Sequence, residues 1–224
     1  MKKETLLLGI IGLLVVVIAV IGASYYRNST QPGPGTDSGP APVSEALVRP
    51  DSPSFGPADA PVTIVEFYDP ECESCAAFHS SIKTVMNEYE GKVRLVSRIM
   101  PLHPNSALAA TFIELAGEKG KYREAQEFVF RKQPEWGTIH GPASTAQPDA
   151  PALFDKYVTE FGLDAADFRA ALRENRYANR LERDMADGRS LGVSKTPTIF
   201  VNGRVLMRLS EPDLRYLVAQ ELSK

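Results

Sequence analysis

Residues 62–99 carry the pattern that most restricts the fold: a buried strand, an amphipathic helix and a second strand. The run Val62–Tyr68 is β-branched and aromatic with little alternation, which is typical of a strand covered on both faces. Residues 75–89 place apolar side chains at three- and four-residue steps, and Gly91 ends this helix. Because residues 93–99 form a second strand, the segment predicts a right-handed βαβ crossover with parallel strands.

The rest of the chain predicts a helical block, a short hairpin and a last helix. We expect the block to contain helices at residues 105–118, 121–131, 150–161, 165–175 and 177–191. Strands at 198–202 and 204–209 are joined by Asn202-Gly203, a strong signal for a two-residue hairpin turn. The last helix, 211–222, has Ser210 as its expected N-cap. The predicted class is therefore α/β, in the order βαβ, helical insertion, ββα.

An apolar segment near the N-terminus sets the expected location of the protein. No residue from 5 to 26 is charged, and residues 6–23 provide about the 20 apolar residues that a membrane-spanning helix needs. The apolar run is longer than the roughly 7–15 residues of a secretion signal, so we expect an uncleaved anchor at residues 1–27. A cleaved signal is the alternative. Lys2 and Lys3 precede the segment, which places the rest of the chain outside the cytoplasm.

The next residues, 28–53, are expected to form a linker. Seven of the chain's 17 prolines lie between residues 28 and 60, and this composition disfavours both helix and sheet. The remainder, 54–224, is the expected folded domain, with its helical insertion at about 105–191.

The charge of the chain excludes one class of partner. There are 25 Lys and Arg against 28 Asp and Glu, a formal net charge of −3. This balance provides no electrostatic attraction to nucleic-acid phosphates. We therefore expect no nucleic-acid partner.

The only two cysteines, Cys72 and Cys75, stand at the expected strand-to-helix turn. Unpaired backbone N–H groups and the positive end of the helix dipole stabilise a thiolate there, so Cys72 is the expected nucleophile. Cys75 lies one helical turn further along, within reach of Cys72, and is expected to resolve a mixed disulfide. A structural zinc site is disfavoured because no second cysteine pair exists and the three histidines lack zinc-ligand spacing.

His79 provides an alternative to redox catalysis. It follows Cys75 by four residues, on roughly the same face of the helix. A set of Cys72, Cys75 and His79 would suit copper, and this makes a non-catalytic copper or thiol chaperone the alternative function. A lone histidine on an amphipathic helix is more often a packing residue, so we expect no metal and no cofactor.

The order of these motifs resembles the DsbA-like thiol:disulfide oxidoreductases, which have the thioredoxin fold. The resemblance rests on a strand ending Glu-Phe-Tyr, the Cys72-Glu-Ser-Cys75 motif, the helical insertion, and Gly-Val-Ser-Lys-Thr-Pro-Thr-Ile-Phe-Val-Asn-Gly at residues 192–203. It spans about residues 54–222. The resemblance implies that Pro197 is a cis proline facing the cysteines, and that the backbone of Thr196 binds the substrate chain.

Glu66 is a carboxylate in an otherwise apolar strand. Buried below the cysteines, it would have a raised pKa and would exchange a proton with Cys75; a solvated strand end is the alternative. The family has an acid six residues before the first cysteine, which is the position of Glu66 relative to Cys72. Arg98, near the end of the second strand, is expected to be either its counter-charge or a surface arginine.

Two further acids flank the nucleophile. Glu71 and Glu73 stand on either side of Cys72, where their charges would oppose its ionisation. We therefore expect the pKa of Cys72 to lie above the value of about 3.5 found in strongly oxidising relatives. A less stabilised thiolate makes the disulfide a weaker oxidant.

These features predict a membrane-tethered enzyme that exchanges disulfides with exported proteins on the outer, extracytoplasmic or periplasmic side of the cytoplasmic membrane. The family implies a membrane redox partner, and a monomer is the expected state. A thiol reductase or isomerase of the same fold is the alternative within the enzyme class.

Overall fold

The structure is a computed structural model, which describes residues 44–142 and 144–224. The predicted membrane anchor lies outside the described residues, as does most of the predicted linker. No helix within these described ranges has the length and apolar character needed to cross a bilayer. The elements are β1 (Ser54–Phe55), β2 (Val62–Tyr68), α2 (Glu73–Glu88), β3 (Val93–Ile99), α3 (Ser106–Gly117), α4 (Tyr122–Trp136), α5 (Ala150–Phe161), α6 (Ala165–Arg173), α7 (Ala178–Ser190), β4 (Thr198–Val201), β5 (Arg204–Val205) and α8 (Glu211–Leu222).

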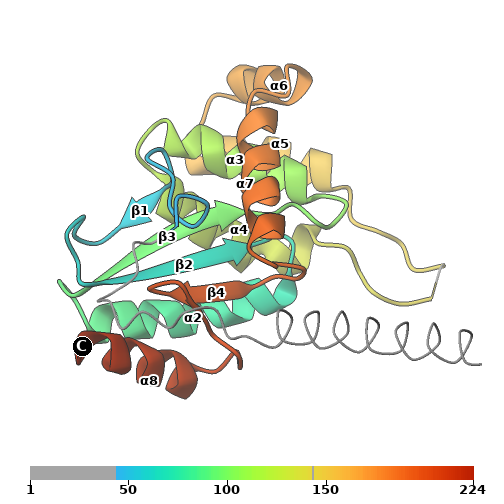
Figure 1. Cartoon of the computed structure of the whole chain (residues 1–224). Helices are drawn as coiled ribbons and strands as arrows, with labels where there is room; N and C mark the ends of the chain where they lie inside the picture. The colour runs from blue at the N-terminus through green and yellow to red at the C-terminus, as the bar shows by residue number, and fades with distance from the viewer. Residues whose placement is uncertain (1–43, 143) are drawn as a thin grey trace, which may run out of the picture. The chain divides into compact units, whose positions relative to one another are not determined.

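The predicted βαβ unit forms the centre of the sheet. The sheet has the order β1-β3-β2-β4-β5 (Figure 1). β2 and β3 are parallel and in register from Val62 opposite Val93 to Tyr68 opposite Ile99, while β4 runs antiparallel to β2. All seven residues of β2 are buried, as expected for a central strand. The α/β prediction and both strand ranges of the βαβ unit are confirmed.

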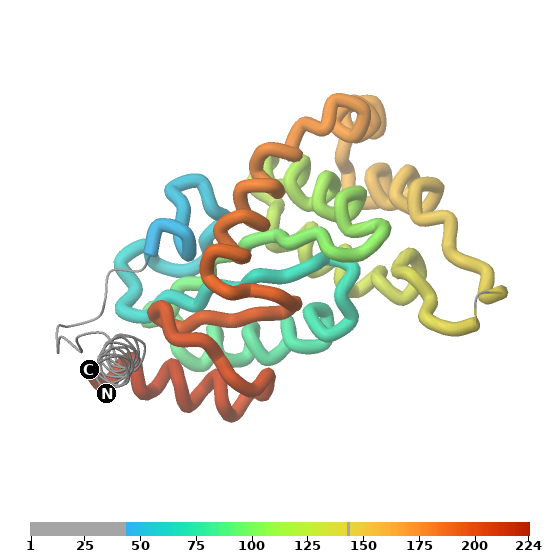
Figure 2. Tube along the Cα trace, turned by 45° about the vertical axis from the view of Figure 1, so that its right-hand side comes forward, coloured from blue at the N-terminus to red at the C-terminus, as the bar shows by residue number. Residues whose placement is uncertain are grey.

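Helices cover both faces of this sheet. Alternate residues of β2, among them Val62 and Ile64, pack with apolar residues of α2 and α8. The intervening residues Val65 and Phe67 pack on the opposite side, where Met185 of α7 lies against the same core. Figure 1 and Figure 2 show α2 and α8 on one side of the sheet and α7 crossing the other. The side-chain alternation of β2 therefore divides the core into two layers.

The helical insertion has an aromatic core of its own. The Phe112 ring contacts four other phenylalanine rings at centroid distances of 5.3–6.3 Å, namely Phe128, Phe154, Phe161 and Phe168. The sequence predicts that α4 ends at Arg131 and leaves Trp136 in a loop, but α4 continues through Pro134 to Trp136. The Trp136 side chain is fully buried, donates from Nε1 to the Val129 carbonyl oxygen at 3.2 Å and packs on Phe154. Trp136 is therefore a packing anchor and not a residue that lines the surface.

The hairpin turn is confirmed, but the second strand is shorter than predicted. Asn202 and Gly203 both have positive φ angles, of 46° and 83°, which a two-residue turn of this kind requires. β5 nevertheless contains only Arg204 and Val205, because the chain then turns toward α8. Ser210 caps α8 as predicted, with its side chain accepting a hydrogen bond from the Asp213 amide.

The folded part begins before the predicted boundary at residue 54. Leu47 is 3% exposed and packs in the core layer on the α7 side of the sheet. The Arg49 guanidinium donates two hydrogen bonds to the Asp187 carboxylate, at 2.9 and 2.7 Å. The last ten residues of the predicted linker thus pack on the domain.

Arg98 differs from both expectations for it. It is fully buried, so it is not a surface arginine, and its side chain lies beside Phe67, on the sheet face opposite Glu66. The guanidinium pairs with Asp184 and Asp187 of α7 and also donates to the backbone carbonyls of Ala46 and Leu47. Arg98 therefore joins three parts of the chain, namely β3, α7 and the N-terminal segment.

This buried ion pair leads to a stability prediction. Replacing Arg98 by Leu leaves the buried Asp184 carboxylate without its strongest partner, so we expect Arg98→Leu to lower the free energy of unfolding by about 3–5 kcal/mol. The control is Arg208→Leu, which removes an exposed pair with Asp213 and should cost at most about 1 kcal/mol. Denaturant unfolding measures both, and equal effects would contradict the assigned role of Arg98.

Candidate functional site

The two cysteines lie where α2 begins, above the end of β2. Cys72 is the N-cap residue of α2, with extended backbone angles, and the Cys75 and Ala76 amides donate to its carbonyl oxygen. Cys72 is 8% exposed and Cys75 is fully buried, and both thiols are free. The Cys72 sulfur therefore lies near the surface, and the Cys75 sulfur lies beneath it.

This difference in position produces opposite pKa shifts of the two thiols. A hydrogen bond from the Cys75 thiol is the main cause that lowers the pKa of Cys72 to about 6; the Thr196 side chain and the Cys75 and Ser74 amides add to it. Burial, followed by the interaction with Cys72, raises the pKa of Cys75 far above its usual value. At neutral pH the pair holds a thiolate at Cys72 and a thiol at Cys75.

The loop before β4 closes the site from the other side. The Thr196–Pro197 peptide bond is cis, and the Cys72 thiol lies 3.4 Å from the Thr196 carbonyl oxygen, to which it donates when protonated. Cys72 and Thr196 are 124 residues apart in the chain, and the pairing of β4 with β2 brings them together. The contact that the family resemblance predicted between this loop and the cysteines is present.

Glu66 lies beneath the cysteines, on the α2 side of the sheet. It is fully buried, and neither carboxyl oxygen has a hydrogen-bond partner among the described residues. Burial raises the pKa of Glu66 to about 8; the nearby Gln126 amide lowers it and the Cys72 charge raises it further. Ionised Glu66 in turn raises the pKa of Cys75. The buried-acid interpretation therefore agrees with the structure, and a solvated strand end does not.

Asp69 is a buried residue of the site that the sequence analysis missed. Its carboxylate accepts hydrogen bonds from the amides of Glu71, Leu102 and His103, from His103 Nδ1 and from the Ser106 hydroxyl. These bonds connect the redox turn, residues 69–72 between β2 and α2, to the loop between β3 and α3. A carboxylate placed directly after a buried strand, before Pro70, was the available signal.

The Glu71 carboxylate has hydrogen-bond partners that the sequence does not indicate. Its carboxylate is turned toward the helical insertion, where it accepts hydrogen bonds from the backbone and side chain of both Asn105 and Thr138. Burial alone would raise the pKa of Glu71, but these hydrogen bonds outweigh it and leave the pKa lowered. Glu71 thus fixes the redox turn to the insertion. The largest influences on the pKa of Cys72 are Cys75, burial and Thr196, and its value of about 6 lies above about 3.5, as expected.

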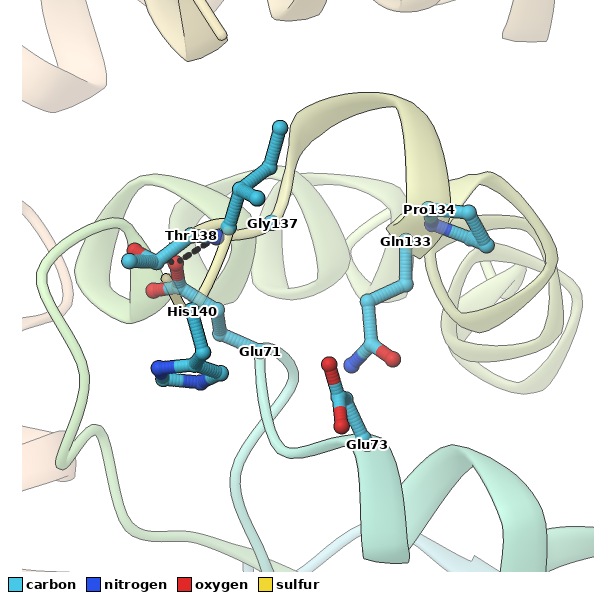
Figure 3. Close-up of a pocket in the computed structure, with 8 residues that line it drawn as sticks. Glu71, Glu73, Gln133, Pro134, Gly137, Thr138 and His140 are labelled. Carbon is cyan, nitrogen blue, oxygen red and sulfur yellow. Dashed lines mark hydrogen bonds between the residues drawn. The ribbon is translucent and has the colours of Figure 1, made fainter. Parts of the chain in front are cut away.

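A pocket of about 560 Å³ lies beside the redox turn, between α2 and the end of α4. Glu71 and Glu73 line one side, and Gln133, Pro134 and residues 137–140 line the other. Figure 3 shows the side chains of Glu73 and Gln133 pointing toward one another across it, with Glu71 bonded to Thr138. The pocket provides an open surface immediately next to Cys72.

His79 is not arranged to bind copper with the cysteines. Its ring packs against Phe130 of α4, with centroids 5.3 Å apart. Within the described part of the chain, no group of three or more His, Cys, Asp or Glu side chains is placed to hold a metal ion. The set of copper ligands considered from the sequence is therefore not brought together.

The buried Glu66 leads to a pH-dependent stability prediction. In the unfolded chain this carboxyl loses its proton near pH 4.5, but in the folded chain only near pH 8. Its burial therefore destabilises the fold increasingly as the pH rises between these values. We expect Glu66→Gln to be close to the original chain in stability below pH 4.5 and more stable by up to a few kcal/mol at pH 8.

Denaturant unfolding across this pH range measures the difference. The control is Glu182→Gln, which changes an exposed carboxylate. A stability difference between Glu66→Gln and the original chain that does not vary with pH would contradict the assignment.

Curated relatives of this chain are much longer proteins. It is 34% identical over 152 residues to Na(+)/H(+) antiporter NhaA 3 of Salinispora tropica, a match that covers 66% of this chain and 21% of that protein. The antiporter NhaA of Herminiimonas arsenicoxydans is also 34% identical, over 67% of this chain and 22% of that protein. The chain spans about a fifth of the length of these relatives, and their name describes the longer proteins.

Solved structures and a family model agree on the fold. Oxidised BdbD from Bacillus subtilis matches with a TM-score of 0.67 and 25% identity, covering 77% of this chain and 94% of that one. A thioredoxin-like oxidoreductase from Silicibacter pomeroyi matches with a TM-score of 0.65 and 21% identity, covering 80% and 98%. The thiol-disulfide exchange protein alpha-DsbA2 from Wolbachia pipientis has a TM-score of 0.61 and 21% identity, covering 79% and 90%. The family model described as Thioredoxin matches residues 49–219, and the chain therefore belongs to the thioredoxin family, with a DsbA-like fold.

Proposed function

We propose that this chain exchanges disulfides with other polypeptides through Cys72 and Cys75. The Cys72 thiolate attacks a substrate disulfide, forms a mixed disulfide and releases one substrate thiolate. The Cys75 thiol then loses its proton, attacks the Cys72 sulfur and releases the second substrate thiolate. The reverse sequence oxidises a substrate dithiol. The observation that carries this proposal is the opposite shift of the two thiol pKa values within one buried pair.

Glu66 is the proposed proton acceptor for Cys75. A thiol with a strongly raised pKa must lose its proton before it can attack, and a buried carboxyl group with a pKa near 8 is close enough to neutral pH for its ionised fraction to receive that proton. The proton passes from the Cys75 sulfur to a Glu66 oxygen, which leaves a thiolate and a neutral carboxyl group. Glu66 is therefore a proposed catalytic residue, together with the two cysteines.

Thr196 and Pro197 are the proposed binding site for the substrate backbone. The Thr196 carbonyl lies within 3.4 Å of the Cys72 sulfur, so a chain paired with this backbone would have its own sulfur close to Cys72. An extended peptide can add to exposed backbone of this kind as a strand adds to a sheet. The pocket lined by Glu73 and Gln133 provides room for further substrate residues next to Cys72.

The proposed place of action is outside the cytoplasm. The uncharged segment at residues 5–26 supports an anchor in the cytoplasmic membrane with the domain on the outer side. An oxidising compartment favours disulfide formation in exported proteins, with a membrane redox partner to reoxidise the pair. We propose that the chain works there as a monomer. Reduction or isomerisation uses the same site in the opposite direction.

Trapping of the mixed disulfide tests this function. In Cys75→Ser the attack by Cys72 proceeds but resolution does not, so a disulfide-linked adduct should accumulate with an unfolded protein that contains a disulfide. In Cys72→Ser the remaining thiol is buried and protonated, and the adduct should be at least about tenfold less abundant. Non-reducing gel electrophoresis with mass spectrometry measures both. Equal trapping by the two variants, or none by Cys75→Ser, would contradict the proposal.

A further inference from the structure

Buried polar atoms without hydrogen-bond partners are concentrated in one place. In residues 44–142 and 144–224, nine buried side-chain nitrogen and oxygen atoms lack a partner, and six of them belong to Glu66, Gln126 and His79. In each of these three residues, both polar atoms are unpartnered. Groups of this kind commonly hydrogen-bond to buried water.

The three residues lie together between β2, α2 and α4. The Gln126 amide is close enough to Glu66 to lower the pKa of its carboxyl group. His79 lies one helical turn after Cys75 on α2, and its ring packs on Phe130, which is one turn after Gln126 on α4. Residues four apart on a helix are neighbours on one face, so His79 and Gln126 face the same seam between the two helices.

The outer end of this seam opens to the surface. A pocket of about 300 Å³ between α2 and α4 is lined by His79, Lys83 and Glu127, among others. His79 Nε2 lies 3.8 Å from Glu127 Oε1, beyond hydrogen-bonding distance, and the Glu127 side chain is 30% exposed. His79 thus stands between the interior and a solvent-facing carboxylate.

The other neighbours of Glu66 on its strand face provide no such route. Val62 and Ile64, which share its face of β2, pack in the apolar core with α2 and α8. Tyr68, the next residue on this face, uses its hydroxyl group in a 3.0 Å hydrogen bond with the Tyr122 hydroxyl. Gln126 is therefore the polar neighbour of Glu66 whose own side-chain atoms are left without partners.

We propose that Gln126 and His79 hold a short chain of water molecules. This chain carries a proton between Glu66 and the solvent in the pocket between α2 and α4. This inference rests on the proposed function. At neutral pH most Glu66 carboxyl groups carry a proton, so before resolution the neutral carboxyl must pass this proton to the water at Gln126. That water passes a proton to one nitrogen of His79 while the other nitrogen releases one to the pocket. The water and His79 return to their neutral states, and the ionised Glu66 can then accept the proton of Cys75.

The test separates the two thiol steps in one reaction. The reduced chain reacts with the chromogenic disulfide 5,5′-dithiobis(2-nitrobenzoate), which releases one coloured thiolate on attack by Cys72 and a second on resolution by Cys75. Stopped-flow absorbance records both phases. We expect His79→Ala and Gln126→Leu to slow the second phase by roughly tenfold or more and to leave the first phase unchanged.

Chemical rescue distinguishes a proton path from a structural effect. Added imidazole should fit the space left in His79→Ala, carry the proton in place of the side chain and restore the rate of the second phase. The control is Phe78→Leu, at the neighbouring position of α2, where the side chain packs with apolar residues of β2 and α8. Imidazole should have no effect on the second phase of this control.

The outcomes are distinct. A second phase as fast as in the original chain in both His79→Ala and Gln126→Leu would overturn the proton path while leaving the exchange function intact. A slow second phase in His79→Ala that imidazole does not accelerate would also overturn it. Absence of a second phase in the original chain would overturn the exchange function and the path together.

Discussion

The hydrogen bond between the two thiols is the interaction on which the site depends. It stabilises the charge on Cys72 and the proton on Cys75 at once, because one sulfur accepts and the other donates. Its geometry follows from the helix: with Cys72 at the N-cap and Cys75 in the first turn, the two side chains lie on one face. The backbone amides of that first turn add to the stabilisation of Cys72.

The surrounding fold holds this pair through buried charged groups that lie outside the Cys-x-x-Cys motif. Asp69 binds the redox turn to the loop after β3, and Glu71 binds it to the helical insertion through Asn105 and Thr138. On the far side of the sheet, Arg98 joins β3 to α7, the helix that leads into the Thr196–Pro197 loop. Buried charged side chains therefore hold both segments beside the cysteines. Asp69 and Glu71 hold the redox turn, and Arg98 holds the helix before the Thr196–Pro197 loop.

Much of this architecture could be predicted from local sequence signals. The β2 and β3 ranges followed from apolar runs bounded by Asp69-Pro70 and by Gly91, and the cap of α8 followed from Ser210. The positions of Cys72 and Cys75 at the turn followed from the same pattern. The cis bond before Pro197 was expected from the family resemblance alone, because most bonds before proline are trans.

The incorrect predictions concern partners that are distant in sequence. Arg98 lies 86 positions from its partner Asp184, and nothing in the local pattern connects them. The hydrogen bond of the Glu71 carboxylate with Thr138, 67 positions away, likewise has no signal in the local sequence. Residues 44–53 had the composition of a linker, and only the contacts of Leu47 and Arg49 with the domain show that they pack on it.

The most direct test of the account is a residue-resolved titration of the reduced pair. With ¹³C-labelled cysteine, the Cβ chemical shifts of Cys72 and Cys75 report the ionisation of each thiol separately. The account predicts a midpoint near pH 6 for Cys72 and no ionisation of Cys75 in the neutral range. Two similar midpoints near the ordinary cysteine value of about 8.5, or a lower midpoint for Cys75 than for Cys72, would contradict it.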